Sequence, residues 1–201
     1  MLNEMEINKN IMAIGPKGSG KAWFLNKLLT FERDEVLFRM SKSASSSERD
    51  SLWEDTRSLI LEDGRSINVK AFKARGVKDE KSMNTLEDSW NEMHRRNIFL
   101  NRVILVVNFI EYKYHSQEIL SILEQLSKYL DNSSILIINR IPNKLDANLE
   151  NKIEKMQVDI LHRINREINN IFRIENDISE DGGITNNIEN QKKFKEIRKI
   201  L

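Results

Sequence analysis

Residues 15–21, with the sequence Gly-Pro-Lys-Gly-Ser-Gly-Lys, restrict the possible folds of this chain more than any other segment. They follow the phosphate-loop pattern G-x-x-x-x-G-K, in which glycines let backbone N–H groups surround an anion and the lysine reaches the phosphates. The pattern normally continues with Ser or Thr, whose hydroxyl ligates Mg²⁺, but Ala22 stands at that position. The chain therefore keeps the groups that hold a polyphosphate and lacks one usual metal ligand.

The residues on both sides of this loop predict a strand–loop–helix unit. Residues 10–14 are apolar enough for a short buried strand, and residues 23–29 carry apolar side chains at helical spacing. A helix beginning at Lys21 would direct its N-terminal N–H groups and its dipole at the same anion. A glycine-rich turn that binds nothing is the alternative, and it leaves the lysine and both flanks unexplained. The predicted phosphate-binding residues are Gly15, Gly18, Ser19, Gly20, Lys21 and Ala22.

Length and composition fit one α/β domain that spans residues 1–201. The 32 basic and 31 acidic residues leave a net charge of +1, which argues against a nucleic-acid partner. The chain has no cysteine, so neither disulfides nor a thiolate metal site is expected. The longest apolar run, residues 103–107, is too short to cross a bilayer, and the first residues lack signal-peptide features. We therefore expect a cytoplasmic protein without an integral membrane segment.

Alternating apolar runs and amphipathic segments predict the rest of the fold. Further strands are expected at residues 102–109, 134–138 and 171–174. Helices are expected at residues 83–96, 116–130 and 149–169, and near the C-terminus. The turn Glu-Asp-Gly at residues 62–64 predicts a hairpin between residues 52–61 and 66–72. Loops are expected at residues 41–50 and 73–81, and residues 111–115 are predicted to be an exposed connector. The pattern predicts a three-layer sandwich with a mostly parallel sheet and one antiparallel strand.

This order of elements resembles the G domain of P-loop GTPases. Residues 18–29, Gly-Ser-Gly-Lys-Ala-Trp-Phe-Leu-Asn-Lys-Leu-Leu, resemble the first motif and helix of the immunity-associated GTPases, of GIMAP or avirulence-induced-gene type. That stretch runs GSGKS[ST]FLNxLL in the family, which is related to septins and dynamins. The resemblance implies a P-loop NTPase fold and GTP or GDP as the ligand. It covers the whole chain as an order of elements and mainly the first motif as residues.

On the metal side, the chain departs from the motifs of that family. The first-switch Thr that contacts Mg²⁺ corresponds to the serine-rich loop at residues 45–50, where Glu48 stands near its place and one of the serines could substitute. The second-switch motif D-x-x-G corresponds to Lys-Ala-Arg-Gly at residues 73–76, so Lys73 replaces the acid and Gly76 remains. A lysine puts positive charge where Mg²⁺ would sit. Either other groups hold the metal or the protein works without it, and in both cases slow or absent hydrolysis is expected.

The base-reading motif N-K-x-D is altered as well. Asn139 and Arg140 fit its first two positions, but Pro142 stands where the guanine-reading carboxylate belongs. Four residues later, residues 143–146 spell Asn-Lys-Leu-Asp, and Asp146 would reach a base only after a longer strand exit. Asn176 resembles part of the family's Phe-Asn-Asn stretch. The candidate base-binding residues are Asn139, Arg140, Asp146 and Asn176.

Different functions fit these observations. One is a GIMAP-like guanine-nucleotide-binding protein with weak or absent hydrolysis. Another is a pseudo-GTPase that serves as an interaction module, for a protein partner or a second copy of the chain. A P-loop ATP-dependent phosphotransferase ranks lower, because no arginine-rich lid is present as a motif. Trp23 is predicted either to pack beneath the loop or to crowd the nucleotide pocket. The apolar row that begins at Leu149 is either core or a helix-pairing surface.

Overall fold

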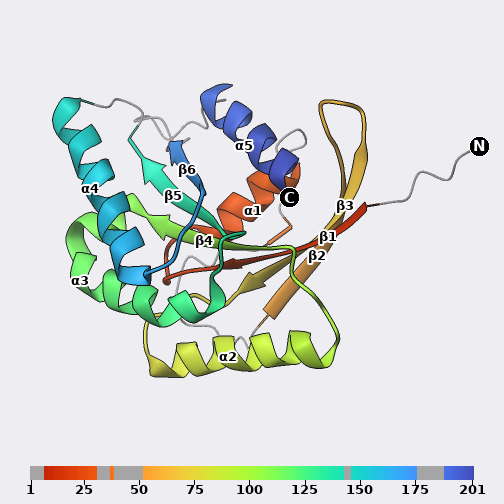
Figure 1. Cartoon of the computed structure of the whole chain (residues 1–201), viewed down its shortest axis with the longest axis horizontal. Coiled ribbons are helices and arrows are strands. Elements are labelled where there is room, and N and C mark those ends of the chain that lie inside the picture. Colours follow the sequence, from red (N-terminus) through yellow and green to blue (C-terminus); the bar gives the residue numbers. More distant parts are fainter. Residues whose placement is uncertain (1–6, 31–36, 39–51, 143–145, 176–187) are drawn as a thin grey trace, which may run out of the picture.

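The computed structural model describes residues 7–30, 37–38, 52–142, 146–175 and 188–201. Its strands form one six-stranded sheet in the order β2-β3-β1-β4-β5-β6 (Figure 1). All neighbouring strands are parallel except the β2–β3 hairpin, which is antiparallel. The strand bounds are Ile7–Ile14 (β1), Leu52–Ile60 (β2), Ser66–Ala74 (β3), Arg102–Asn108 (β4), Ile135–Ile141 (β5) and Asn170–Glu175 (β6). The predicted fold class, a mostly parallel sheet with one antiparallel strand, is confirmed.

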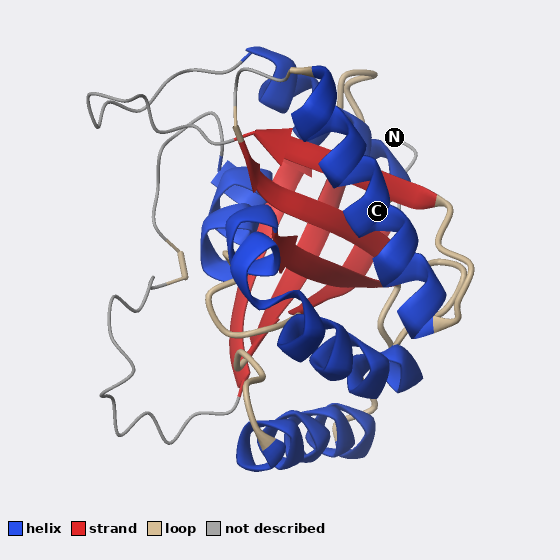
Figure 2. Ribbon diagram, turned by 90° about the vertical axis from the view of Figure 1, so that its left-hand side faces the viewer, coloured by secondary structure: helices blue, strands red, loops and turns tan. Residues whose placement is uncertain are grey.

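Helices cover both faces of this sheet (Figure 2). α1 (Lys21–Thr30) and α5 (Ile188–Ile200) share one face, where Phe24 and Phe194 pack with ring centroids 5.8 Å apart. α2 (Glu80–Arg95), α3 (Phe109–Leu126) and α4 (Ala147–Ile164) cover the other face. The short 3₁₀ turn η1 (Ser127–Tyr129) follows α3. The central strands are therefore buried on both sides, which explains why their sequences are continuous apolar runs without alternation.

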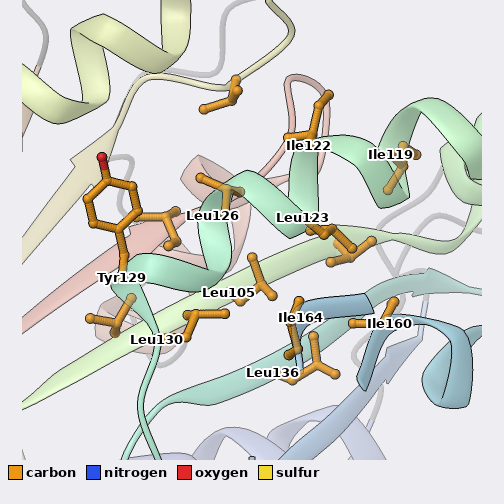
Figure 3. Close-up of a cluster of buried hydrophobic side chains, with 14 of the residues drawn as sticks. Leu105, Ile119, Ile122, Leu123, Leu126, Tyr129, Leu130, Leu136, Ile160 and Ile164 are labelled. Atoms are coloured by element: carbon orange, nitrogen blue, oxygen red, sulfur yellow. The ribbon is translucent and has the colours of Figure 1, made fainter. Parts of the chain in front are cut away.

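The apolar row of α4 belongs to the core. Ile153, Met156, Ile160 and Ile164 are at most 1% exposed and join the cluster that α3 and the strands β4 and β5 form. Figure 3 shows Ile160 and Ile164 beside Leu136 of β5, with Leu123 of α3 across the cluster. The core interpretation of this row is confirmed, and the row is not available as a separate pairing surface.

Some predicted boundaries were wrong. Residues 111–115 are helical and not a connector, because Asn108 caps α3 and accepts a hydrogen bond from Ile110 N at 2.9 Å, so the helix begins at Phe109. The helix is kinked at His115, whose φ of −134° and ψ of 38° are non-helical, directly before the predicted helix start at residue 116. Tyr112 is buried in this first part of the helix and its hydroxyl donates to Asp159 of α4 across 2.8 Å. The loop predicted at residues 73–81 is shorter, since β3 runs through Ala74 and α2 begins at Glu80. The predicted loop at residues 41–50 lies outside the described residues.

Candidate phosphate-binding site

The glycine loop joins β1 to α1 at the carboxyl end of the parallel strands, where open α/β sheets bind their ligands (Figure 1). Gly18 and Gly20 have φ angles of +78° and +90°, which glycine adopts without strain. A Cβ atom on Gly15 would collide with the carbonyl oxygen of Val106 in β4, and one on Gly20 would collide with the side-chain amide of Asn139 in β5. The loop therefore lies against the ends of both strands, and Gly15 and Gly20 permit that approach.

Lys21, the first residue of α1, folds back over the loop. Its Nζ donates to the carbonyl oxygens of Gly15 at 3.0 Å and Pro16 at 2.8 Å, and to Ser19 Oγ at 3.3 Å. The residue is 7% exposed. Burial, and to a smaller extent the positive charge of Lys73, lower the pKa of the Lys21 ammonium to about 7. Among the described residues, the acceptors of this buried ammonium are all neutral oxygens, so an anionic partner would stabilise its charge.

Two asparagines hold the outer side of the loop. Asn108 Nδ2, at the end of β4, donates to Gly18 O across 3.2 Å, and Asn139 Nδ2, near the end of β5, donates to Ser19 O across 3.3 Å. The C=O and N–H of a trans peptide point in opposite directions, so the bond to Ser19 O directs the N–H of Gly20 away from β5. Asn139 was predicted as a base-binding residue, and the structure places its side-chain amide against the phosphate loop. Asn108 was missed, although an Asn between an apolar strand and an amphipathic segment is a helix-cap signal.

Further backbone N–H groups of the loop are also available to an anion. Five N–H groups donate no hydrogen bond to any residue within the described ranges, namely those of Gly18, Gly20, Lys21, Ala22 and Trp23. Several of these N–H groups belong to the first turn of α1, where the helix dipole adds positive potential. Donors, dipole and Lys21 together make a site whose chemistry suits an anion with several oxygens, such as a polyphosphate.

The segment that follows β3 fastens onto this loop. Val77 pairs with Pro16 in a parallel bridge, in which Lys17 N donates to Val77 O across 2.8 Å and Val77 N donates to Gly15 O across 3.2 Å. Gly76 lies so close that a Cβ atom there would stand 2.7 Å from Lys17 Cα. The glycine of the altered D-x-x-G motif is therefore next to the phosphate loop, as the resemblance implies.

On the metal side, two described residues differ from the motif positions that hold Mg²⁺ in P-loop proteins. Ala22 offers no side-chain oxygen, and Lys73 brings a positive charge that reaches Lys21. Lys73 Nζ lies 4.0 Å from the ring centroid of Trp53, its cross-strand neighbour in β2. Within the described part of the chain, His, Cys, Asp and Glu side chains form no group of three or more that could hold a metal ion. Glu48 and its serine-rich loop lie outside the described residues.

The described members of the predicted base-binding set do not lie together at one site. Arg140 is exposed with a φ of +60°, and its N–H donates to Asn139 Oδ1 across 2.8 Å. β5 continues to Ile141, and its pairing with β6 shifts register between Ile138 and Ile141. Asp146 caps α4 and accepts from Leu149 N across 2.7 Å, so this carboxylate has a structural role. Asn176 lies outside the described residues. Of the candidate base-binding set, the structure brings only Asn139 to the loop within the described ranges.

Trp23 takes the packing role that was one of its predicted alternatives. Its ring centroid lies 6.2 Å from that of Phe194 in α5, and it packs against the cluster between α1, α5 and the sheet. The indole therefore packs against α5, and the N–H groups of the first turn of α1 remain beside the loop.

Comparisons with known proteins bear on the fold. No family model matches the chain, and no curated protein matches it. Among solved structures, Toc33 from Arabidopsis thaliana in complex with Mg²⁺ and GMPPNP has a TM-score of 0.58 and 12% sequence identity, over 97% of this chain and 85% of that chain. The chain therefore has the fold of a P-loop GTPase G domain. Within the described ranges, no helix has the length and apolar character to span a membrane.

Proposed function

We propose that this chain binds a nucleoside polyphosphate of the GTP or GDP class at residues 15–22 and hydrolyses it weakly or not at all. The observation that carries the proposal is the buried Lys21 ammonium, whose acceptors among the described residues are neutral oxygens and which lies beside a row of loop N–H groups. Toc33, which shares the fold, was solved with the guanine-nucleotide analogue GMPPNP. A polyphosphate would satisfy the N–H groups and supply a counter-charge for Lys21.

Weak hydrolysis follows from the residues on the metal side. Phosphoryl transfer in P-loop proteins depends on a metal that neutralises the charge on the transferred phosphate and on an oriented water. Ala22 and Lys73 replace an oxygen ligand and an acid. An ammonium a few Å from a divalent ion opposes it by several kcal/mol at an effective dielectric constant of about 20. We expect phosphate release slower than roughly 10⁻⁴ s⁻¹, the intrinsic scale of small GTPases.

A titration calorimetry experiment tests the proposal. GTP, GDP and ATP are titrated into the wild type, into Lys21→Met, which keeps the length and apolar stem but removes the ammonium, and into Lys17→Met. Lys17 is the matched control because it is an exposed lysine of the same loop. We expect binding by the wild type and Lys17→Met and none by Lys21→Met. Equal binding by both variants would place the ligand elsewhere.

The bridge between Val77 and Pro16 favours a second candidate function, an interaction module that does not need nucleotide. The chain itself already holds the segment after β3 against the loop, through the Lys17–Val77 and Val77–Gly15 hydrogen bonds. Such a segment would present one shape to a partner with or without ligand. Hydrogen exchange across residues 75–82, measured with and without GTP, separates the candidates. Unchanged protection favours the module, and increased protection favours nucleotide control.

A further inference from the structure

We propose that residues 75–77 form a strap that fills the place of a third phosphate, so that the site binds a nucleoside diphosphate more tightly than the corresponding triphosphate. This inference rests on the proposed function and specifies the length of the phosphate chain. The strap connects β3 to α2, and the chain itself fastens it to the phosphate loop through the bridge between Val77 and Pro16.

The strap lies directly against the start of the loop. Lys17 N donates to Val77 O across 2.8 Å, and Val77 N donates to Gly15 O across 3.2 Å. A Cβ atom on Gly76 would stand 2.7 Å from Lys17 Cα and 3.2 Å from Lys21 Nζ. The space between the strap, the loop backbone and the ammonium therefore does not admit a methyl group unless one of them shifts. A phosphate group is larger than a methyl group and needs a larger shift.

The position of the Lys21 ammonium indicates where a third phosphate would lie. In loops of this pattern the backbone N–H groups hold the first two phosphates, and the lysine extends toward the last. Lys21 extends to the carbonyl oxygens of Gly15 and Pro16, which belong to the end of the loop that the strap covers. A third phosphate beside Nζ therefore competes with Gly76 for the same space. A diphosphate can stay with the N–H groups and leave the strap in place.

Both ends of the strap are anchored, so its displacement costs free energy. At one end it continues β3, which ends at Ala74 and pairs with β1 and β2. At the other end Asp79 caps α2 in a reciprocal capping box with Ser82, whose hydroxyl also accepts from Lys78 N across 2.9 Å. Between these anchors the side chain of Val77 is 2% exposed and belongs to the core cluster that α2 and α3 cover. A triphosphate must break the hydrogen bonds of the strap before its last phosphate reaches the ammonium.

Calorimetric titration of GDP, GTP, ADP and ATP into the wild type tests this inference. We expect the dissociation constant of each triphosphate to exceed that of the matching diphosphate by about tenfold or more, because two backbone hydrogen bonds must break. The factor should be similar for the guanine and the adenine pair, since the strap lies at the phosphate loop. Hydrogen exchange measured by NMR gives a second readout on the wild type. Saturating GTP should lower the protection of the Val77 N–H, and saturating GDP should leave it unchanged.

A pair of variants assigns the preference to the strap. Val77→Pro removes the N–H that donates to Gly15 O, so it should loosen the strap and bring the ratio of the GTP and GDP dissociation constants toward one. Val77→Ala is the matched control, because it keeps both backbone hydrogen bonds and loses only side-chain methyl groups. It should retain the wild-type ratio.

Equal affinity of the wild type for GDP and GTP, or tighter binding of GTP, would overturn the inference and leave the proposed function standing. Protection of the Val77 N–H that stays unchanged or rises with saturating GTP would do the same. An unchanged preference for the diphosphate in Val77→Pro would assign it to another part of the site and overturn the role of the strap. The wild-type measurements decide the matter even if Val77→Pro does not fold. Failure of all four nucleotides to bind would overturn the proposed function together with this inference.

Discussion

Asn139 Nδ2 donates to the carbonyl oxygen of Ser19 across 3.3 Å, and through this bond the end of β5 fixes the phosphate loop. The residue is 1% exposed, so the bond is sheltered from water. In a base-reading motif the same asparagine would be counted with the residues near the base. Here its contact is with the loop, and it determines which way the next N–H group points.

Removing this amide should weaken phosphate binding more than it weakens the fold. Asn139→Ala deletes one buried hydrogen bond, worth about 1 kcal/mol, and leaves the Gly20 N–H free to rotate away from the ligand. We expect the dissociation constant for GTP to rise by about three- to tenfold. Asn132→Ala, at an exposed position in the turn before β5, is the control and should leave binding unchanged.

Gly20→Ala should destabilise the protein more than Gly64→Ala. Both glycines have a positive φ, +90° and +84°, so both variants carry a similar backbone penalty of about 1 kcal/mol. The added methyl group collides with Asn139 at Gly20 and meets nothing within 4 Å at Gly64. Denaturant unfolding of both variants isolates the collision. Equal losses would show that the loop moves away from β5 without cost.

Nucleotide binding should take up a proton above neutral pH. The pKa of Lys21 is about 7 without a counter-anion, and a polyphosphate beside it would raise that value. Below pH 7 the ammonium is already formed, so affinity is insensitive to this group. Above it, affinity falls by up to about tenfold per pH unit until the raised pKa is reached. Calorimetry in buffers of different ionisation enthalpy measures the uptake, which should approach one proton at about pH 8 and vanish near pH 6.

The same shift should appear in the stability of the ligand-free protein. The folded pKa of Lys21 lies below the unfolded value, so the unfolded chain binds more protons between about pH 7 and pH 10. The free energy of unfolding contributed by this residue therefore rises with pH across that window and is lowest below it. Lys21→Met lacks the titrating group. As the pH is raised from 7 to 9, the free energy of unfolding of the wild type should therefore rise relative to that of Lys21→Met. The lower end of this window is set by the folded-state pKa of Lys21.

Discrimination between GTP and ATP should be weak. Pro142 cannot accept a hydrogen bond through its side chain, and Asp146 is engaged in capping α4. Asp146→Ala would remove the cap, costing about 1 kcal/mol, whereas Asp146→Asn keeps a capping oxygen and removes the charge. Competition of ATP against GTP should give similar ratios for the wild type and Asp146→Asn. A strong GTP preference lost in Asp146→Asn would assign Asp146 to the base.

The parts of the fold that were predictable from sequence are those with a local physical signal. The strand before Gly15, the helix from Lys21 and the hairpin at residues 62–64 follow from apolar periodicity and glycine spacing, and the structure confirms each. The early start of α3 was missed, because the signal is the single residue Asn108 and the burial of Tyr112 depends on a partner in α4. Tertiary contacts of this kind have no counterpart in a local pattern.

The candidate site was likewise only partly predictable from the sequence. Lys21 and the loop glycines are recognisable from the sequence because their spacing reflects one local geometry. The link from Lys73 to Trp53 was not predictable, since it depends on the register of the β2–β3 pair. The capping role of Asp146 was not predictable either, because the sequence Asn-Lys-Leu-Asp fits both a base-reading motif and the start of a helix.

The collision geometry at Gly15 and Gly20 affects how mutational scans of this protein are to be interpreted. Both glycines are needed to bring the loop against β4 and β5 whether or not a ligand is ever present. Loss of function on replacing them would report on architecture, and would look the same in a protein that binds nothing. Lys21→Met keeps a side chain of similar length and adds no atom that collides with a strand, so its effect reports on the ammonium and on the three hydrogen bonds that Nζ donates within the loop. Lys21, and not the glycines, is therefore the diagnostic position for chemistry in this fold.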